Sequence, residues 1–183
     1  MSTLSTSDRK YHHGDLRRAL LDSGLEVIAH STDALSLREL ARRAGVSPAA
    51  VYRHFPDKAA LLAALASQGL AMLGRAQHEA FTAAGGGLDG FAATGVAYVR
   101  FALDHPALFR LTFATAGSAE KSDADAITFL HDNARRYAPP TVEPQTFALQ
   151  AWSLVHGLAT LILDGQLPAD MQMIERTVRA HLA

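Results

Sequence analysis

Apolar residues recur along most of this chain with the period of an α-helix. Between the glycine and proline breakers they return every three or four positions, which places them on one face of a helix. No interval alternates between apolar and polar residues as a half-buried β-strand would. The pattern predicts helices over residues 15–29, 37–44, 48–55, 58–81, 89–104, 106–115, 122–138, 144–164 and 170–183. We therefore expect an all-α protein.

Local signals mark the ends of the short helices in the first third of the chain. Ser36 and Glu39 have the spacing of a capping box, in which each side chain bonds the backbone N–H of the other. Gly45 is expected to end the helix in the left-handed conformation. Ser47 followed by Pro48 is typical of an N-cap and a first-turn proline. These signals predict two short helices joined by a tight turn.

The composition is that of a globular protein that can bury a core. Of 183 residues, 49% are hydrophobic and 19% are charged, which argues against disorder throughout. The chain has no cysteine, which excludes disulfides, thiolate zinc sites and cysteine nucleophiles. Its first 15 residues lack the apolar core of a secretory signal. We expect a cytoplasmic protein.

One stretch has the length of a membrane-spanning helix. Residues 144–163 carry no formal charge over 20 positions. Six polar residues within it favour a buried helix of a soluble protein over a membrane span.

The charges are divided unevenly along the chain. Residues 1–58 carry nine bases and seven acids, whereas residues 59–183 carry eight bases and 11 acids. A weakly basic head on an acidic body permits nucleic-acid binding without requiring it. The arrangement of the side chains must therefore decide between function classes.

Residues 37–55, LRELARRAGVSPAAVYRHF, have the pattern of a helix-turn-helix. Leu40, Ala41 and Val46 are expected to face inward, with Val51 and Phe55 on the second helix. The opposite face of that helix is left to Pro48, Ala49, Tyr52 and Arg53. In a helix-turn-helix this face enters the major groove of DNA. An ordinary helical hairpin is the alternative.

The flanking residues extend this pattern into a family resemblance. From Tyr11 to about Leu65, with YHHGDLR and then LRELARRAGVSPAAVYRHFPDKAALL, the chain resembles the DNA-binding domain of TetR-type transcriptional regulators. The resemblance implies DNA contacts from Ser36, Tyr52, His54 and Lys58 to phosphates and from Pro48, Ala49, Ala50 and Arg53 to base edges. Ser47 joins this expected DNA-binding set.

Elementary chemistry agrees with this division of roles. Arg53 is the one side chain of the set that can bond guanine with two parallel hydrogen bonds. Tyr52 and His54 carry hydrogen-bond donors, and Lys58 begins the next helix, whose N-terminal dipole also favours phosphate. Upstream, Arg9, Lys10, His12 and His13 form a basic arm, of which Lys10, His12 and His13 are expected to contact DNA. A solvated, disordered terminus is the alternative for the arm.

The predicted helix 144–164 is apolar over most of its circumference and must be covered on nearly all sides. Small or uncharged residues recur along one stripe of this helix, and apolar residues lie on one side of the last helix. We expect a subunit interface from Gln150, Ser153, Gly157, Thr160, Ile174 and Val178. The segment AWSLVHGLATLILDG resembles the Trp-x-x-x-His-Gly signature of one subgroup of TetR-type C-terminal domains. That resemblance implies a four-helix bundle between two copies. Packing of both helices in the monomer core is the alternative.

A ligand pocket is implied by the resemblance alone. Candidate lining residues are Tyr98, Phe101, Phe109, Phe113, Phe129 and Trp152. Aromatic residues at helical spacing are also ordinary core residues, which is the alternative reading. His156 is expected to be a core or interface histidine. Because no two histidines have the His-x-x-x-His spacing and no nucleophile stands beside a base, we expect no metal, no cofactor and no catalysis.

The sequence therefore predicts a helix-turn-helix DNA-binding domain with its arm in residues 1–58 and a helical effector-binding and dimerisation domain in residues 59–183. The expected protein is a homodimeric repressor that a small molecule releases from a palindromic, double-stranded DNA operator, without a membrane partner. A small all-α enzyme or ligand-binding protein with a purely structural helix-turn-helix is the alternative.

Overall fold

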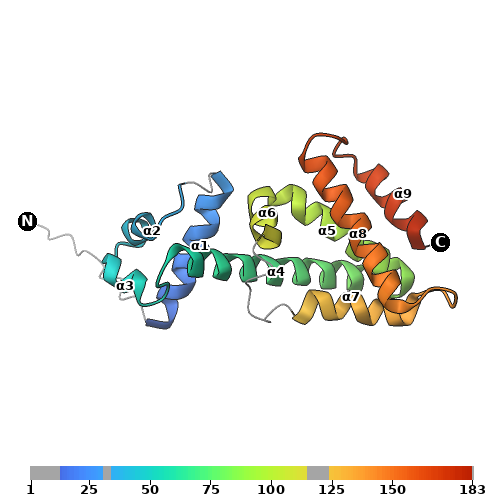
Figure 1. Cartoon of the computed structure of the whole chain (residues 1–183), viewed down its shortest axis with the longest axis horizontal. Helices are drawn as coiled ribbons and strands as arrows, with labels where there is room; N and C mark the ends of the chain where they lie inside the picture. The colour runs from blue at the N-terminus through green and yellow to red at the C-terminus, as the bar shows by residue number, and fades with distance from the viewer. Residues whose placement is uncertain (1–12, 31–33, 115–123, 183) are drawn as a thin grey trace, which may run out of the picture. The chain divides into compact units, whose positions relative to one another are not determined.

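The computed structural model describes residues 13–30, 34–114 and 124–182, and every regular element in these ranges is an α-helix (Figure 1). The helices are α1 (His13–His30), α2 (Leu37–Ala44), α3 (Pro48–Tyr52), α4 (Lys58–Ala83), α5 (Gly87–Asp104), α6 (Pro106–Ala114), α7 (Ala124–Tyr137), α8 (Pro144–Leu163) and α9 (Met171–Leu182). The all-α prediction is confirmed. Predicted helix ends at Thr115, Ser122 and Ala183 lie outside the described residues.

The third helix is shorter than predicted. It has five residues and ends at Tyr52 rather than at Phe55. Beyond it the chain tightens into a turn in which the N–H of His54 donates to the carbonyl oxygen of Val51 at 2.9 Å. Pro56 contributes to the early end, because it has no N–H to donate to the carbonyl oxygen of Tyr52 and disfavours the helical conformation in Phe55.

The chain divides into two compact units, residues 1–61 and 62–183. In the first unit α1, α2 and α3 surround a small core. Leu20 of α1, Leu40 of α2 and Val51 of α3 are fully buried there, and Phe55 joins them. The guanidinium of Arg17 lies over the Phe55 ring, 5.4 Å from its centre. Of the inward face that the sequence predicts for the helix-turn-helix, Leu40, Ala41, Val51 and Phe55 are buried and Val46 is half-buried.

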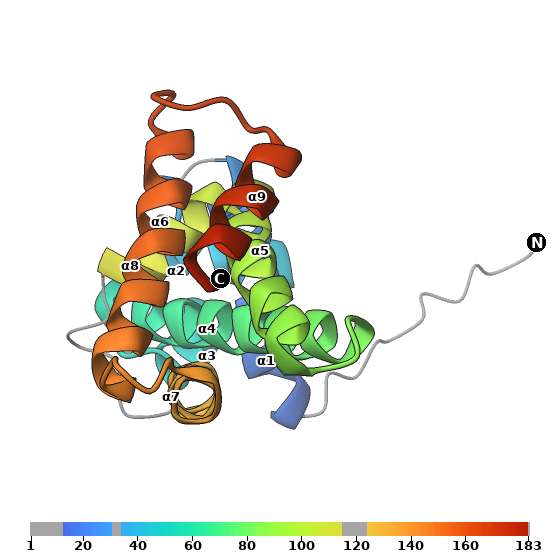
Figure 2. The same ribbon diagram turned by 90° about the vertical axis from the view of Figure 1, so that its right-hand side faces the viewer.

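The second unit contains most of α4 together with α5 to α9. Here α5 lies beside α8 and α9, and α7 packs against α8 (Figure 2). Phe91 and Phe147 are 6.0 Å apart between ring centres, and Tyr98 and His156 are 6.2 Å apart. Because both pairs advance together along the chain, α5 and α8 run in the same direction.

Two residues expected at a subunit interface belong to the core of the second unit. Ile174 and Val178 of α9 are 0% and 4% exposed. Val178 approaches α5 so closely that a Cβ on Gly95 would lie 2.9 Å from its Cγ1. The expectation for these two side chains is corrected: α9 turns them toward α5, inside one chain.

Two helices, α4 and α8, are long and apolar enough to cross a membrane by length and composition alone. Core helices of soluble proteins pass the same test, and both helices contribute buried residues to the second unit. Packing within the unit accounts for the buried part of each helix, which is 28% of the apolar window in α4 and 39% in α8.

Helices α4 and α6 meet at a point that only glycine allows. A Cβ on Gly69 would overlap Oγ1 of Thr112 and lie 3.0 Å from Cδ1 of Leu108. Gly74, five residues further along α4, has room, because its Cβ would lie 3.7 Å from the Cβ of Ala126. A side chain is therefore sterically excluded at Gly69 and tolerated at Gly74.

This difference predicts opposite effects of the same substitution. We expect Gly69→Ala to lower the free energy of unfolding by about 1–3 kcal/mol through overpacking, despite the better helix propensity of alanine. Gly74→Ala should raise it by about 0.5–1 kcal/mol, because alanine only improves helix propensity there. Urea unfolding followed by circular dichroism measures both. Equal changes of the same sign would show that the α4–α6 contact does not need glycine.

Candidate nucleic-acid interface and ligand cavity

The turn of the helix-turn-helix is built on Gly45. This residue has φ +65° and ψ 30°, a left-handed conformation that side chains with a Cβ rarely adopt. Its N–H donates to the carbonyl oxygen of Arg42 at 3.3 Å, and the N–H of Val46 donates to that of Ala41 at 3.0 Å. These bonds satisfy carbonyl groups at the end of α2 and direct the chain into α3.

The start of α3 follows the predicted cap. Oγ of Ser47 accepts a hydrogen bond from the N–H of Ala50 at 3.3 Å, and Pro48 occupies the first turn. Ala50 is buried beside Val51. The expectation that Ala50 approaches a base edge is corrected, because its methyl group packs inside the first unit.

The opposite face of α3 is exposed. Pro48, Ala49 and Arg53 lie in solvent, and Tyr52 is 45% exposed although it is a large aromatic residue. Two further residues of the predicted DNA-binding set follow at once, His54 half-buried and Lys58 exposed. The structure therefore brings this part of the set together on and just after one short helix.

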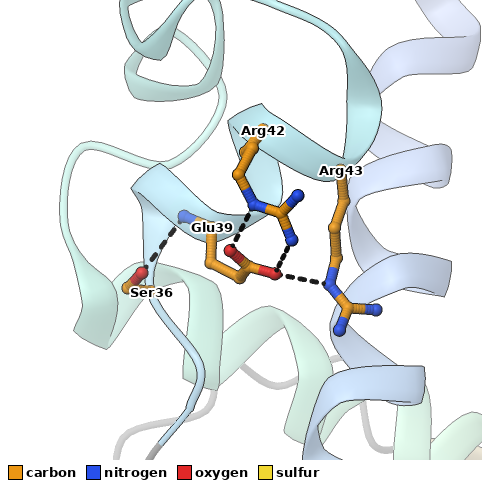
Figure 3. A network of polar contacts seen from close by, with 4 residues as sticks. All are labelled: Ser36, Glu39, Arg42 and Arg43. Carbon is orange, nitrogen blue, oxygen red and sulfur yellow. Dashed lines mark hydrogen bonds and ion pairs between the residues drawn. The ribbon is translucent and has the colours of Figure 1, made fainter.

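Helix α2 carries an ionic cluster beside its capping residue (Figure 3). Oγ of Ser36 accepts the N–H of Glu39 at 3.1 Å. The Glu39 carboxylate does not complete the predicted capping box; it accepts hydrogen bonds from Arg42 at 2.7 and 2.8 Å and from Arg43 at 2.9 Å. The two guanidinium groups outcompete the backbone N–H as charged donors. Ser36 itself is exposed.

The two arginines also set the protonation of Glu39. Hydrogen bonds from Arg42 and then Arg43 lower the pKa of Glu39 to about 2. A carboxyl whose folded-state pKa lies below its unfolded value contributes stability above the unfolded pKa. That contribution is lost as the pH falls from about 4.5 toward 2.

We expect a nuclear magnetic resonance titration of the Glu39 carboxyl carbon to show an ionised group down to pH values well below the ordinary range for glutamate. Arg42→Gln should move its midpoint upward, because it removes the largest stabilising hydrogen bond. Arg135→Gln, which alters an exposed pair with Asp132 in the second unit, serves as the control. A wild-type midpoint at the ordinary glutamate value would contradict the geometry of this cluster.

The basic arm is mostly outside the described part of the chain. Lys10 and His12 lie outside the described residues, and His13 is the first residue of α1 with a side chain that is not described. Their expected DNA contacts stay predictions.

The second unit contains a partly open cavity of about 260 Å³. Its walls come from α4 to α9 and are mainly apolar, with Leu73, Leu130 and Val155 among them. Among the described residues that line it, none is an aspartate, glutamate, lysine or arginine. The cavity is therefore suited to an uncharged, largely apolar molecule.

Three of the six predicted ligand residues, Tyr98, Phe113 and Trp152, line this cavity. Phe101 and Phe109 are buried core residues that do not line it. Phe129 packs on Phe81 of α4 with ring centres 5.3 Å apart and lines two other hollows between α4 and α7. The sequence missed His181 and Thr94 as lining residues, because an isolated histidine or threonine in a helix carries no signal for a cavity.

One wall of the cavity holds a neutral hydrogen-bond network. The hydroxyl group of Tyr98 lies 2.8 Å from Nδ1 of His156, and Nε1 of Trp152 donates to the Tyr98 oxygen at 3.3 Å. Burial raises the pKa of Tyr98 and lowers the pKa of His156, so both are neutral at neutral pH. The Tyr98 O–H then donates to the unprotonated Nδ1, and His156 is a satisfied histidine at the edge of the core.

The outer face of α8 carries the remaining predicted interface residues. Gln150, Ser153 and Thr160 are exposed, and apart from its chain neighbours and the backbone of its own helix, no described atom would lie within 4 Å of a Cβ on Gly157. The same helix exposes large apolar side chains, namely Leu149 (59%), Trp152 (43%) and Leu161 (45%). An exposed apolar surface of this kind commonly marks a protein contact.

Each of the two units contains a segment that matches a known protein family. Residues 20–65 match the family model of bacterial regulatory proteins of the tetR family, and residues 91–183 match that of the tetracyclin repressor-like C-terminal domain. No curated protein sequence matches the chain.

Solved structures with the same fold cover nearly the whole chain. A protein of unknown function from Rhodococcus sp. RHA1 is 33% identical, with a TM-score of 0.79 over 96% of this chain and 95% of that one. A TetR family transcription regulator from Marinobacter aquaeolei VT8 is 22% identical, with a TM-score of 0.67 over 92% and 94%. A tetR family regulatory protein from Rhodococcus RHA1 is 21% identical, with a TM-score of 0.63 over 91% and 95%.

Proposed function

The chain belongs to the TetR family of transcriptional regulators, and on this basis we propose that it is a cytoplasmic, homodimeric repressor that leaves a palindromic operator when a small molecule binds. The observation that supports DNA binding most directly is the exposed outer face of α3. Tyr52 and Arg53 project from a helix whose other face, with Ala50 and Val51, is buried. A helix-turn-helix uses this face in the major groove.

The exposed residues divide by chemistry into two sets. The hydroxyls of Ser36 and Tyr52, the His54 ring and the Lys58 ammonium suit phosphate oxygens, which position a protein on DNA. Arg53 suits the O6 and N7 atoms of guanine. Pro48 and Ala49, exposed at the start of α3, can offer apolar contact to a thymine methyl group, while Ser47 caps the helix.

Two copies are needed because one recognition helix is short. Five residues at about 1.5 Å per residue span roughly 7.5 Å, which covers only a few base pairs. Two such helices related by a two-fold axis would read a palindrome at sites about 34 Å apart. The exposed stripe of α8, with Gly157 at its centre, is the proposed contact between the copies.

The cavity of the second unit is the proposed effector site. A ligand that prefers one conformation of this unit shifts the population toward it and weakens DNA binding when that conformation spaces the two recognition helices wrongly. Helix α4 contributes residues to both units and is the covalent route between them.

We expect Arg53→Ala to cost about 1–3 kcal/mol on the preferred operator and to relax the base preference at one position, because it removes a bidentate contact. Lys58→Ala should weaken all DNA sequences alike, because it removes a phosphate contact. Arg75→Ala, an equal loss of charge at an exposed position of α4 in the second unit, is the control. Gel shifts on a set of operator variants measure all three. If Arg53→Ala lowered the affinity equally for every operator variant, Arg53 would not distinguish between bases.

We expect Gly157→Glu to split the dimer, because it places a charge in the middle of the α8 stripe. Specific DNA binding should be lost with it, although α2 and α3 are untouched. Gln166→Glu adds the same charge in the exposed turn after α8 and should leave the dimer intact. Sedimentation velocity and gel shifts on the same samples provide the test. A folded Gly157→Glu protein that sediments as a dimer and binds its operator would exclude this interface.

A further inference from the structure

Arg17 of α1 is held against the ring of a buried residue next to the proposed DNA-binding face. Its guanidinium carbon lies 5.4 Å from the centre of the Phe55 ring, within the range of a cation–π contact. Phe55 is 1% exposed, and its N–H donates to the carbonyl oxygen of Val51 at 2.9 Å, so the ring is fixed in the core of the first unit. Arg17 itself is exposed. The contact therefore holds an exposed cation on a rigid support.

This contact leaves the hydrogen-bonding edge of the guanidinium unused. Among the residues whose side chains are described, none forms a hydrogen bond or an ion pair with Arg17. By contrast, Arg18 is paired with Asp22 at 3.9 Å, and the two arginines near the end of α2 are paired with Glu39. An arginine that stacks one face on an aromatic ring keeps its in-plane N–H groups free, and these match two oxygens of a phosphate.

Phe55 places this cation beside two other expected phosphate contacts. His54 immediately precedes Phe55 and is half-buried, and Lys58 follows three residues later and is exposed. Three residues of chain span at most about 11 Å, so these basic side chains belong to one small region of the first unit. The intervening carboxylate, Asp57, accepts the N–H of Ala60 at 2.8 Å and caps α4. That carboxylate is engaged at the helix start, and the region keeps a net positive charge.

We propose that Arg17 is a further DNA-binding residue, which donates from the edge of its guanidinium to phosphate oxygens while its face rests on Phe55. This inference rests on the proposed function, in which the first unit binds DNA. It gives α1 a direct part in the contact, in addition to its part in the core through Leu20. Because every nucleotide carries the same phosphate, Arg17 adds affinity for all sequences alike and does not read bases.

Arg17→Gln tests the contact, with Arg18→Gln as the matched control. Both remove one charge from neighbouring exposed positions of α1, but only the first removes the stacked guanidinium. Fluorescence anisotropy measures the affinity as a function of salt concentration, on DNA from upstream of the coding gene and on an unrelated duplex of the same length. Urea unfolding followed by circular dichroism measures whether each variant is folded.

We expect Arg17→Gln to weaken binding to both duplexes by at least about tenfold at roughly 100 mM salt, as the loss of a charged hydrogen bond requires. The slope of log affinity against log salt concentration should become shallower by about 0.9 per copy, or about 1.8 for a dimer, because fewer counterions are released. Arg18→Gln should change the slope by less than half as much, because Arg18 is already paired with Asp22.

The outcomes separate this inference from the proposed function. A folded Arg17→Gln protein with the wild-type slope would overturn the inference alone, because the cation–π contact would then serve only the stability of the first unit. A loss confined to the upstream DNA would also overturn it, because Arg17 would then read bases. If the wild-type protein bound neither duplex, the proposed function would fail, and this inference with it.

Phe55→Leu tests the part of the ring, because it keeps a buried apolar side chain and removes the aromatic face. In this background the loss caused by Arg17→Gln should shrink by at least about twofold, as for two residues that act through one contact. An undiminished loss would overturn the positioning role of the ring. If Phe55→Leu does not fold, Arg17→Lys replaces it, since lysine keeps the charge without the planar fork. Arg17→Lys should then restore the salt slope and not the affinity, and wild-type affinity would overturn the same role.

Discussion

The left-handed turn at Gly45 is the constraint on which the DNA-binding face depends. With φ at +65°, the chain leaves α2 and enters α3 after only three intervening residues. This direction lets Val51 and Phe55 enter the core of the first unit while Tyr52 and Arg53 remain in solvent. A residue with a Cβ would strain this conformation. That single turn therefore determines which face of α3 is buried and which face, with its polar side chains, is exposed.

Helix α8 has a comparable role in the second unit, because it takes part in two different surfaces. Val155 and Ile162 are buried inside the unit, whereas Ser153 and Gly157 lie on the outer stripe. Trp152 lies between these faces: it lines the cavity, bonds Tyr98 and is still 43% exposed. A ligand in the cavity and a second copy on the stripe would therefore act on neighbouring residues of one helix. This arrangement offers a short physical connection between effector binding and the spacing of two recognition helices.

The parts of this structure that could be predicted from sequence are those specified by local interactions. The caps at Ser36 and Ser47 and the stop at Gly45 each depend on residues within one turn, and all three are present. The Glu39 half of the capping box failed, because two nearby arginines compete for the same carboxylate. A local sequence pattern indicates which partners a side chain can reach, but it does not indicate which of them the side chain will bond.

Features that depend on neighbours distant in sequence could not be predicted. Ala50 and Val178 are small or apolar residues that suit a buried or an outward position equally, and only the packing of α3 and α9 decides between them. The cavity is lined from six helices, so no single segment contains its signal. Phe109 and Phe129 are aromatic like Tyr98, yet they lie in the core and beside α4 respectively. His181 lines the cavity, with its ring stacked on Phe147 of another helix, and this contact is not visible in the sequence.

The exposed face of α3, presented twice by a dimer, is proposed to bind DNA through its phosphates and bases. The salt dependence of binding to DNA from upstream of the coding gene, with the stoichiometry measured on the same samples, tests this most directly. The account predicts two copies per bound duplex and an affinity that falls at least about tenfold between roughly 50 and 200 mM salt, as the release of counterions from DNA requires. No binding at low salt, or binding of a single copy with no dependence on salt, would contradict it.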